Sequence, residues 1–198
     1  MATQPSRKFM TYQEFEDMPR HGMISELLDG EFYVVSPVLR HQRLVRKLLV
    51  ALDAFLEGHP IAEVIPAPFD IVLSKEQARV IQPDLMILTT ETHNRLERNR
   101  KYQEARLLGM PYMAIEVLSG DGRHDRGKKL QYYAENRVPE LWHVWPDSTL
   151  VEVYRTEASG HFSKVTAAGP GAVVTTPLLP GFELEVDALY SSLSISED

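Results

Sequence analysis

Residues 80–88 read Val-Ile-Gln-Pro-Asp-Leu-Met-Ile-Leu, and residues 111–118 read Pro-Tyr-Met-Ala-Ile-Glu-Val-Leu. Both are short apolar runs of the length of a buried strand, and each contains one carboxylate, Asp84 or Glu116. Burying a carboxylate is costly unless it is paired or bound to a cation. A salt bridge or a position at a solvent-facing sheet edge would satisfy each acid. Two such acids on neighbouring strands would instead form an oxygen-rich site suited to Mg²⁺ or Mn²⁺.

The residues around these runs carry both helix and strand patterns. Thr11 has the position of a helix N-cap, Asp29-Gly30 is a hairpin turn pair, and apolar residues recur at three- and four-residue steps from Leu44 to Leu52. Helices are predicted over 11–18, 38–57 and 124–136, a hairpin over 26–35, and strands over 61–65, 69–73, 80–88, 111–118, 141–145 and 150–154. This order predicts an α/β (α+β) fold, with a mixed β-sheet core flanked by helices, an N-terminal hairpin and short C-terminal strands.

Length and composition predict one ordinary globular domain. The 198 residues suit a single domain over 1–190, followed by a frayed acidic tail over 191–198. The absence of cysteine excludes disulfides, thiolate metal sites and a cysteine nucleophile, so any metal must bind oxygen or imidazole. No apolar run is long enough for a transmembrane helix, and the N-terminus lacks the apolar middle of a signal peptide. We therefore expect a cytoplasmic protein.

The net charge of −7 is unevenly distributed. Segments 95–106 and 123–129 each carry a local charge of +3. Such residues are often simply solvated on an exposed helix face. Because screening limits the reach of distant charges, a local basic patch can also bind phosphates on an acidic protein.

Residues 122–129 look at first like a phosphate-binding loop, because Gly122 is followed by Gly127 and Lys128. However, Lys129 stands where the magnesium-binding Ser or Thr of such a loop would be, and Asp125 would repel a phosphate. A nucleotide site is therefore not expected. A new helix would instead place Asp125, Lys128 and Tyr132 on one face, with Lys128 leaning towards the end of the strand that carries Glu116.

Taken together, these motifs resemble the PD-(D/E)XK (restriction endonuclease-like) nuclease superfamily, and more narrowly its Uma family of endonucleases. The resemblance covers roughly residues 11–155 in the right order. It rests on Gln82-Pro83-Asp84-Leu85, Glu116-Val117-Leu118-Ser119, Asp125 with Lys128, Glu26 before Asp29-Gly30, Ser36-Pro37 with His41, Pro111, and Leu141-Trp142-His143-Val144-Trp145-Pro146.

The resemblance implies a metal-dependent endonuclease that hydrolyses DNA phosphodiester bonds. Asp84, Glu116 and the backbone carbonyl of Val117 would hold Mg²⁺ or Mn²⁺, and Glu26 would complete the site or bind a second ion. Such a cation would polarise the scissile phosphate and lower the pKa of a bound water.

The chain departs from the superfamily at one catalytic position, because Leu118 stands where the consensus has a lysine. The resemblance implies that Lys128, from the following helix, replaces that lysine and acts on the nucleophile and the phosphorus. His41 and Asp125 would support the metal ligands or contact the substrate. For His41, a hydrogen-bonded core position is the alternative.

Arg123, Arg126 and Lys129 would contact the backbone phosphates of duplex or structured DNA. A homodimer would bring two sites to the two antiparallel strands, although no residue indicates one. The net negative charge favours a different function, that of a catalytically silent scaffold or nucleic-acid-binding protein that keeps the same fold.

Overall fold

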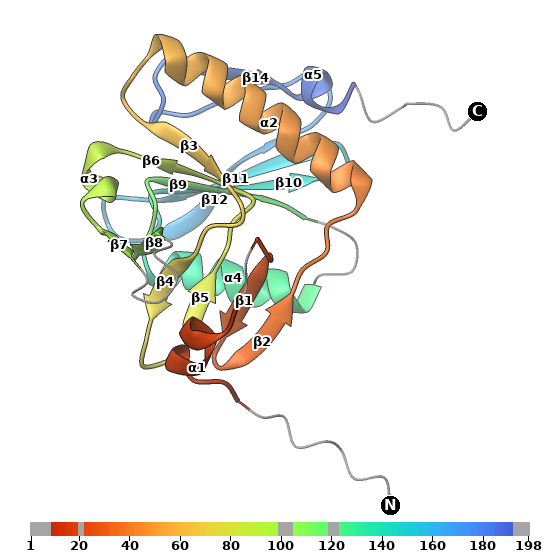
Figure 1. Cartoon of the computed structure of the whole chain (residues 1–198). Coiled ribbons are helices and arrows are strands. Elements are labelled where there is room, and N and C mark those ends of the chain that lie inside the picture. Colours follow the sequence, from red (N-terminus) through yellow and green to blue (C-terminus); the bar gives the residue numbers. More distant parts are fainter. Residues whose placement is uncertain (1–8, 20–21, 99–104, 119–122, 192–198) are drawn as a thin grey trace, which may run out of the picture.

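The structure is a computed structural model, and it describes residues 9–19, 22–98, 105–118 and 123–191, without the side chains of 123–126 (Figure 1). Its helices are α1 (Tyr12–Asp17), α2 (Leu39–Gly58), α3 (Thr90–His93), α4 (Arg123–Glu135) and α5 (Val186–Tyr190). Its strands are β1 (Ser25–Leu28), β2 (Glu31–Val34), β3 (Glu63–Pro66), β4 (Ile71–Ser74), β5 (Arg79–Ile81), β6 (Leu85–Leu88), β7 (Leu96–Arg98), β8 (Ala105–Leu108), β9 (Met113–Val117), β10 (Glu140–Trp145), β11 (Leu150–Thr156), β12 (Phe162–Ala168), β13 (Val173–Thr175) and β14 (Glu183–Glu185).

The strands form two large mixed sheets and one small one. The first sheet has the order β2-β1-β5-β4-β8-β7, the second has the order β12-β11-β10-β9-β6-β3, and β13 pairs with β14. Most neighbours are antiparallel, but β9 and β10 run parallel, as do β4 and β8. The predicted mixed core flanked by helices is therefore confirmed, although it is divided between two sheets.

Helices α2 and α4 cover opposite faces of the second sheet (Figure 1). The face under α2 holds Ile87 of β6 and Ile115 of β9, whereas the face towards α4 and the first sheet holds Met86 and Ala114. This alternation follows from the two-residue period of a strand. Asp84 comes two residues before Met86, and Glu116 comes two residues after Ala114. Both acids therefore lie on the face of the second sheet that is directed towards α4.

Several local predictions are confirmed. Thr11 caps α1 in a capping box with Glu14. Asp29 and Gly30 form the β1–β2 turn with φ of 54° and 81°, the left-handed conformation that Asp-Gly pairs adopt readily. The predicted helix over 38–57 is α2, with one buried stripe of leucines.

Other predictions were wrong. The strand expected over 80–88 is interrupted at residues 82–84, where the chain leaves the first sheet as β5 and enters the second as β6. Strands β7 and β8, which were not among the predicted strands, occupy part of the segment 95–106. The short helices α3 and α5 were not expected.

Two arginines of the segment 95–106 make contacts within the protein. Arg106 is buried and forms ion pairs with Glu16 and Glu97, and Arg95 donates a hydrogen bond to the carbonyl oxygen of Met110 at 2.7 Å. Residues 99–104, like most of the predicted acidic tail, lie outside the described residues. In the described part of the chain, no helix combines the length and the apolar character needed to span a membrane.

The packing of α2 predicts a large effect of core truncation. Leu48 is fully buried against the second sheet, and Leu48→Ala should lower the free energy of unfolding by about 3 kcal/mol through lost burial and a residual cavity. Val50 lies on the same helix with 58% of its surface exposed, so Val50→Ala should change stability by less than about 0.5 kcal/mol. Urea unfolding followed by circular dichroism measures both, and equal effects would contradict the assigned orientation of α2.

Candidate active site

Two carboxylates from adjacent parts of the second sheet form the centre of the site. Asp84 lies directly before β6, and Glu116 lies in β9, the neighbour of β6. The side chain of Asp84 is 15% exposed and that of Glu116 is 9% exposed. From the sequence, a shared site required that both acids lie on the same face of the sheet. In the structure, both lie on the face directed towards α4.

Lys129 of α4 reaches into this centre and joins two strands. Its Nζ lies 2.8 Å from Oε1 of Glu26 on β1 and 2.7 Å from Oε1 of Glu116 on β9. Glu26 also accepts a hydrogen bond from the backbone N–H of Gln82 at 2.9 Å. The three charged side chains are at most 10% exposed, so the ion pairs are formed in an environment with little water.

The buried carboxyl group of Glu116 has a strongly perturbed pKa. Burial raises its pKa to about 8, and the negative charges of Asp84 and Glu26 act in the same direction, whereas Lys129 opposes them. The hydroxyl of Tyr133 on α4 donates a hydrogen bond to Oε1 of Glu116 at 2.6 Å. The pKa of Tyr133 is raised well above its ordinary value by burial and by the adjacent Glu116, so its hydroxyl keeps its proton.

Asp84 is held from two sides through one oxygen. Its Oδ2 accepts a hydrogen bond from the backbone N–H of Val117 at 2.7 Å and lies 3.1 Å from Nε2 of His41 on α2. His41 is 5% exposed, and its Nδ1 has no hydrogen-bond partner among the described residues. The other oxygens, Oδ1 of Asp84 and Oε2 of Glu116, make no hydrogen bond with the described part of the chain.

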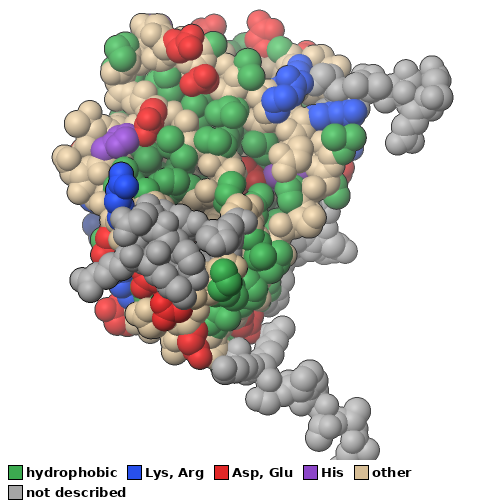
Figure 2. All heavy atoms as spheres, in the orientation of Figure 1, with side chains coloured by type: hydrophobic (Ala, Val, Ile, Leu, Met, Phe, Trp, Pro, Cys, Tyr) green, Lys and Arg blue, Asp and Glu red, His purple; other side chains and the backbone are tan. Residues whose placement is uncertain are grey.

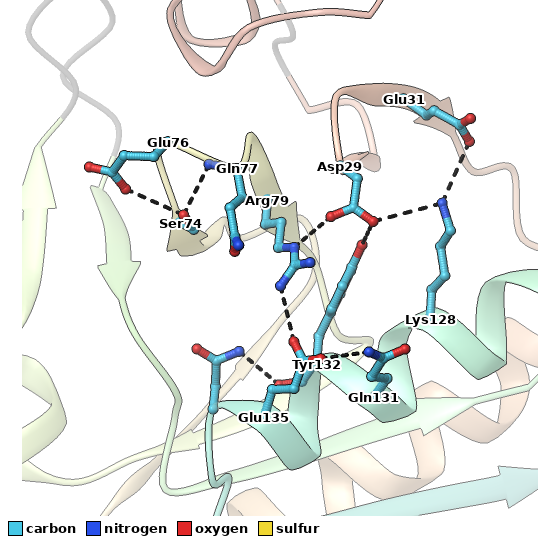
Figure 3. A network of polar contacts seen from close by, with 11 residues as sticks. Asp29, Glu31, Ser74, Glu76, Gln77, Arg79, Lys128, Gln131, Tyr132 and Glu135 are labelled. Atoms are coloured by element: carbon cyan, nitrogen blue, oxygen red, sulfur yellow. Dashed lines mark hydrogen bonds and ion pairs between the residues drawn. The ribbon is translucent and has the colours of Figure 1, made fainter.

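Lys128 lies next to this centre, in a separate polar network (Figure 3). Its Nζ is 3.7 Å from a carboxylate oxygen of Glu31 and 4.0 Å from one of Asp29. Asp29 also accepts hydrogen bonds from Tyr132 at 2.7 Å and from Nε of Arg79 at 2.6 Å. These contacts fasten α4 to the β1–β2 turn.

The network continues along α4 away from the site. Arg79 contacts Glu135 at 3.0 Å, and its guanidinium lies 4.5 Å from the centre of the Tyr132 ring. Because the same side chain binds a turn residue and the end of the helix, it fixes the angle at which α4 crosses the hairpin. Because the orientation of α4 is fixed in this way, the side chain of Lys129 is directed towards Glu26.

The structure thus exchanges the positions expected for the two lysines. Lys129, expected on the surface as a phosphate contact, is buried between Glu26 and Glu116, whereas Lys128 lies against the hairpin. The sequence holds a signal for this, because Lys129 lies four residues, about one helical turn, before the aromatic residue Tyr133 and therefore shares its face of the helix. The side chains of Arg123, Asp125 and Arg126 lie outside the described residues.

The charge of the cluster suits a cation. Asp84, Glu26 and Glu116 outnumber the single ammonium group of Lys129, and a hard divalent ion prefers carboxylate oxygens. No group of three or more His, Asp or Glu side chains in the described part of the chain is arranged to hold a metal by itself. Asp84 and Glu116 therefore fit an ion that keeps several waters or substrate oxygens, as Mg²⁺ commonly does.

The raised pKa of Glu116 predicts a specific pH dependence of stability. Between the ordinary pKa of 4.5 and about 8, the folded chain retains a proton that the unfolded chain has lost. In EDTA, the free energy of unfolding should therefore fall as the pH rises through this window. Glu116→Gln should flatten that slope, whereas Glu57→Gln, which alters an exposed acid of α2, should leave it unchanged. Equal slopes in all three proteins, measured by urea unfolding, would contradict the raised pKa.

The chain is similar to known proteins in sequence and in fold. A family model described as "Uma2: Putative restriction endonuclease" matches residues 12–187. No protein with a curated description matches the chain. Among solved structures, the chain is similar to "a putative nuclease belonging to DUF820" from Anabaena variabilis, with 20% identity, a TM-score of 0.73, and coverage of 93% of this chain and 99% of that one. That likeness shows the fold, and the family match over most of the sequence shows that the chain belongs to the Uma2 family of restriction endonuclease-like proteins.

Proposed function

We propose that this protein is a metal-dependent endonuclease that hydrolyses phosphodiester bonds in DNA. Membership of the Uma2 family supports a nuclease. The observation that carries the finer proposal is the meeting of Asp84, Glu116 and Lys129 on one face of the second sheet, with Lys129 and Glu116 2.7 Å apart. Two carboxylates can hold a divalent ion that activates a water and polarises a phosphate, and an ammonium group can stabilise the charge that develops.

Asp84 and Glu116 would hold the Mg²⁺ or Mn²⁺ ion, together with the backbone carbonyl of Val117. When bound, such an ion polarises a phosphoryl oxygen and lowers the pKa of a coordinated water. The contacts of Glu26 favour a different role from the metal ligand first expected. Since its Oε1 accepts hydrogen bonds from Gln82 and Lys129, Glu26 anchors the lysine.

Lys129 would act directly on the reacting groups. Its ammonium group is held by Glu26 next to Glu116, where it can orient the attacking water and stabilise negative charge that develops on the phosphate. This is the role that the family resemblance implies for Lys128. The contacts of Lys128 with Asp29 and Glu31 favour a supporting role for that residue.

His41 would fix the orientation of the Asp84 carboxylate. The hydrogen bond from the backbone N–H of Val117 and the contact with Nε2 of His41 both engage Oδ2 of Asp84, which leaves Oδ1 for a cation. Metal ligands that are oriented by such outer hydrogen bonds lose less entropy on binding, and loss of the outer partner typically weakens binding by about 10- to 100-fold.

The first test of the proposal is metal binding. Isothermal titration should detect binding of Mn²⁺ to the wild type and its loss in Asp84→Asn and in Glu116→Gln, because each variant removes an anionic ligand. Both variants should also lose at least about 100-fold in the rate of DNA cleavage. Glu183→Gln, which changes an exposed acid on β14, is the matched control and should behave as the wild type.

Wild-type protein that binds Mn²⁺ and DNA but cleaves no duplex, nicked or branched substrate would overturn the catalytic proposal and favour the silent alternative. Cleavage that survives in both variants would overturn the assignment of the metal ligands.

The second test compares the neighbouring lysines. Lys129→Met should lower single-turnover cleavage by at least about 100-fold, while Lys128→Met should stay within a few-fold of the wild type. Mn²⁺ affinity of Lys129→Met should be equal to or higher than that of the wild type, because no ammonium group competes for Oε1 of Glu116.

The buried acids are left without a cation in metal-free Lys129→Met, which should lower its stability by about 3–5 kcal/mol. Lys129→Arg preserves the charge and serves as the second variant, and it should fold but cleave slowly because its guanidinium cannot occupy the same position. A large loss of cleavage in Lys128→Met, with Lys129→Arg fully active, would return the catalytic role to Lys128.

A further inference from the structure

Helix α2 carries a row of arginines that the proposed chemistry does not use. Arg40, Arg43 and Arg46 follow one another at three-residue steps, and we call these three residues the basic ridge. Residues 39–52 contain no acid, although the whole chain has a net charge of −7. The ridge is therefore a local positive stripe on an acidic protein.

The charges of the basic ridge are poorly compensated by the rest of the protein. Within the described residues, neither Arg43 nor Arg46 forms an ion pair. Arg40 contacts Asp147 at 3.0 Å, but the two side chains are 47% and 74% exposed, and such exposed pairs contribute little energy. By contrast, the adjacent Lys47 donates hydrogen bonds to the carbonyl oxygen of Ala188 and to the hydroxyl of Ser191.

The basic ridge begins beside the candidate active site. His41 follows Arg40 directly and contacts Asp84 at 3.1 Å. At a rise of about 1.5 Å per residue, Arg43 and Arg46 lie roughly 3 and 8 Å further along the helix axis than His41. In Figure 2, groups of Lys and Arg side chains lie at the upper right, over the region where Figure 1 draws the first half of α2.

From this placement we propose that the basic ridge binds the phosphate backbone of the DNA that flanks the scissile bond. The inference rests on the proposed nuclease function and adds a substrate-binding surface to it. Duplex DNA carries a negative charge about every 1.7 Å along its axis, so a row of arginines beside the site meets several phosphates. Contacts of this kind position the duplex without reading its sequence.

A second copy of the chain fits the basic ridge less well. A two-fold contact centred on this surface would set arginines against arginines, and like charges that face each other across an interface are costly. Exposed apolar residues do occur nearby, including Val38 at 60% and Leu39 at 66% exposure. The test below therefore also measures the mass of the protein in solution.

The experiment compares the wild type with the double variant Arg43→Gln/Arg46→Gln. Binding of a short fluorescein-labelled DNA duplex is followed by anisotropy between about 50 and 200 mM NaCl, with Ca²⁺ in place of Mg²⁺. The double variant should bind about 10-fold more weakly at the higher salt, and the slope of log K against log [NaCl] should be smaller by about 2. Arg137→Gln, which removes an exposed arginine at the far end of α4, should keep the wild-type slope.

Cleavage in Mg²⁺ by the same proteins separates this inference from the proposed function. If the wild type cleaves DNA and the double variant keeps the wild-type slope, the basic ridge does not bind phosphates, and only this inference falls. A change of mass in light scattering with an unchanged slope would show a protein interface instead. If the wild type neither cleaves nor binds DNA, the proposed function falls and this inference falls with it. If the wild type binds DNA without cleaving it and the double variant has a smaller slope, the result supports the basic ridge and overturns the catalytic proposal.

Discussion

The buried ammonium group of Lys129 is the constraint on which the rest of the site depends. It lies within 2.8 Å of two carboxylates that come from different sheets, Glu26 on β1 and Glu116 on β9. Removing one member of a buried ion cluster is far more costly than breaking an exposed pair, because the remaining charges stay without compensation. Helix α4 must therefore dock in one register, with Lys129 between the two strands.

The surrounding structure reinforces this register from several directions. Tyr132 and Arg79 fasten α4 to Asp29 in the hairpin turn, and the next residue of the helix, Tyr133, donates a hydrogen bond to Glu116. The chain segment Gln82-Pro83-Asp84 crosses from the first sheet to the second at the same place. Both sheets therefore contribute acids to one site at the point where they meet.

Local sequence patterns were sufficient for the features that depend on one element alone. The capping box at Thr11, the Asp29-Gly30 turn and the leucine stripe of α2 depend on neighbours in sequence, and each was predicted from the sequence. Predicting that Asp84 and Glu116 lie on the same face requires the side-chain alternation of both strands and also the knowledge that the two strands are neighbours in the sheet. The choice between Lys128 and Lys129 lay beyond such patterns, because the two point about 100° apart on the helix and only tertiary packing decides which is buried. Strands β7 and β8 were missed because their charged residues form internal ion pairs that a sequence does not display.

The contact between α2 and the C-terminal helix α5 has a consequence for the order of events during synthesis. Lys47 bonds to the carbonyl oxygen of Ala188, which is 141 residues later in the chain, and Leu189 packs in the same core as the leucines of α2. At about 5–20 residues per second, a ribosome needs roughly 7–28 s to add that length. During this interval part of the apolar face of α2 has no final partner, so the nascent chain passes through a state in which chaperones can bind it.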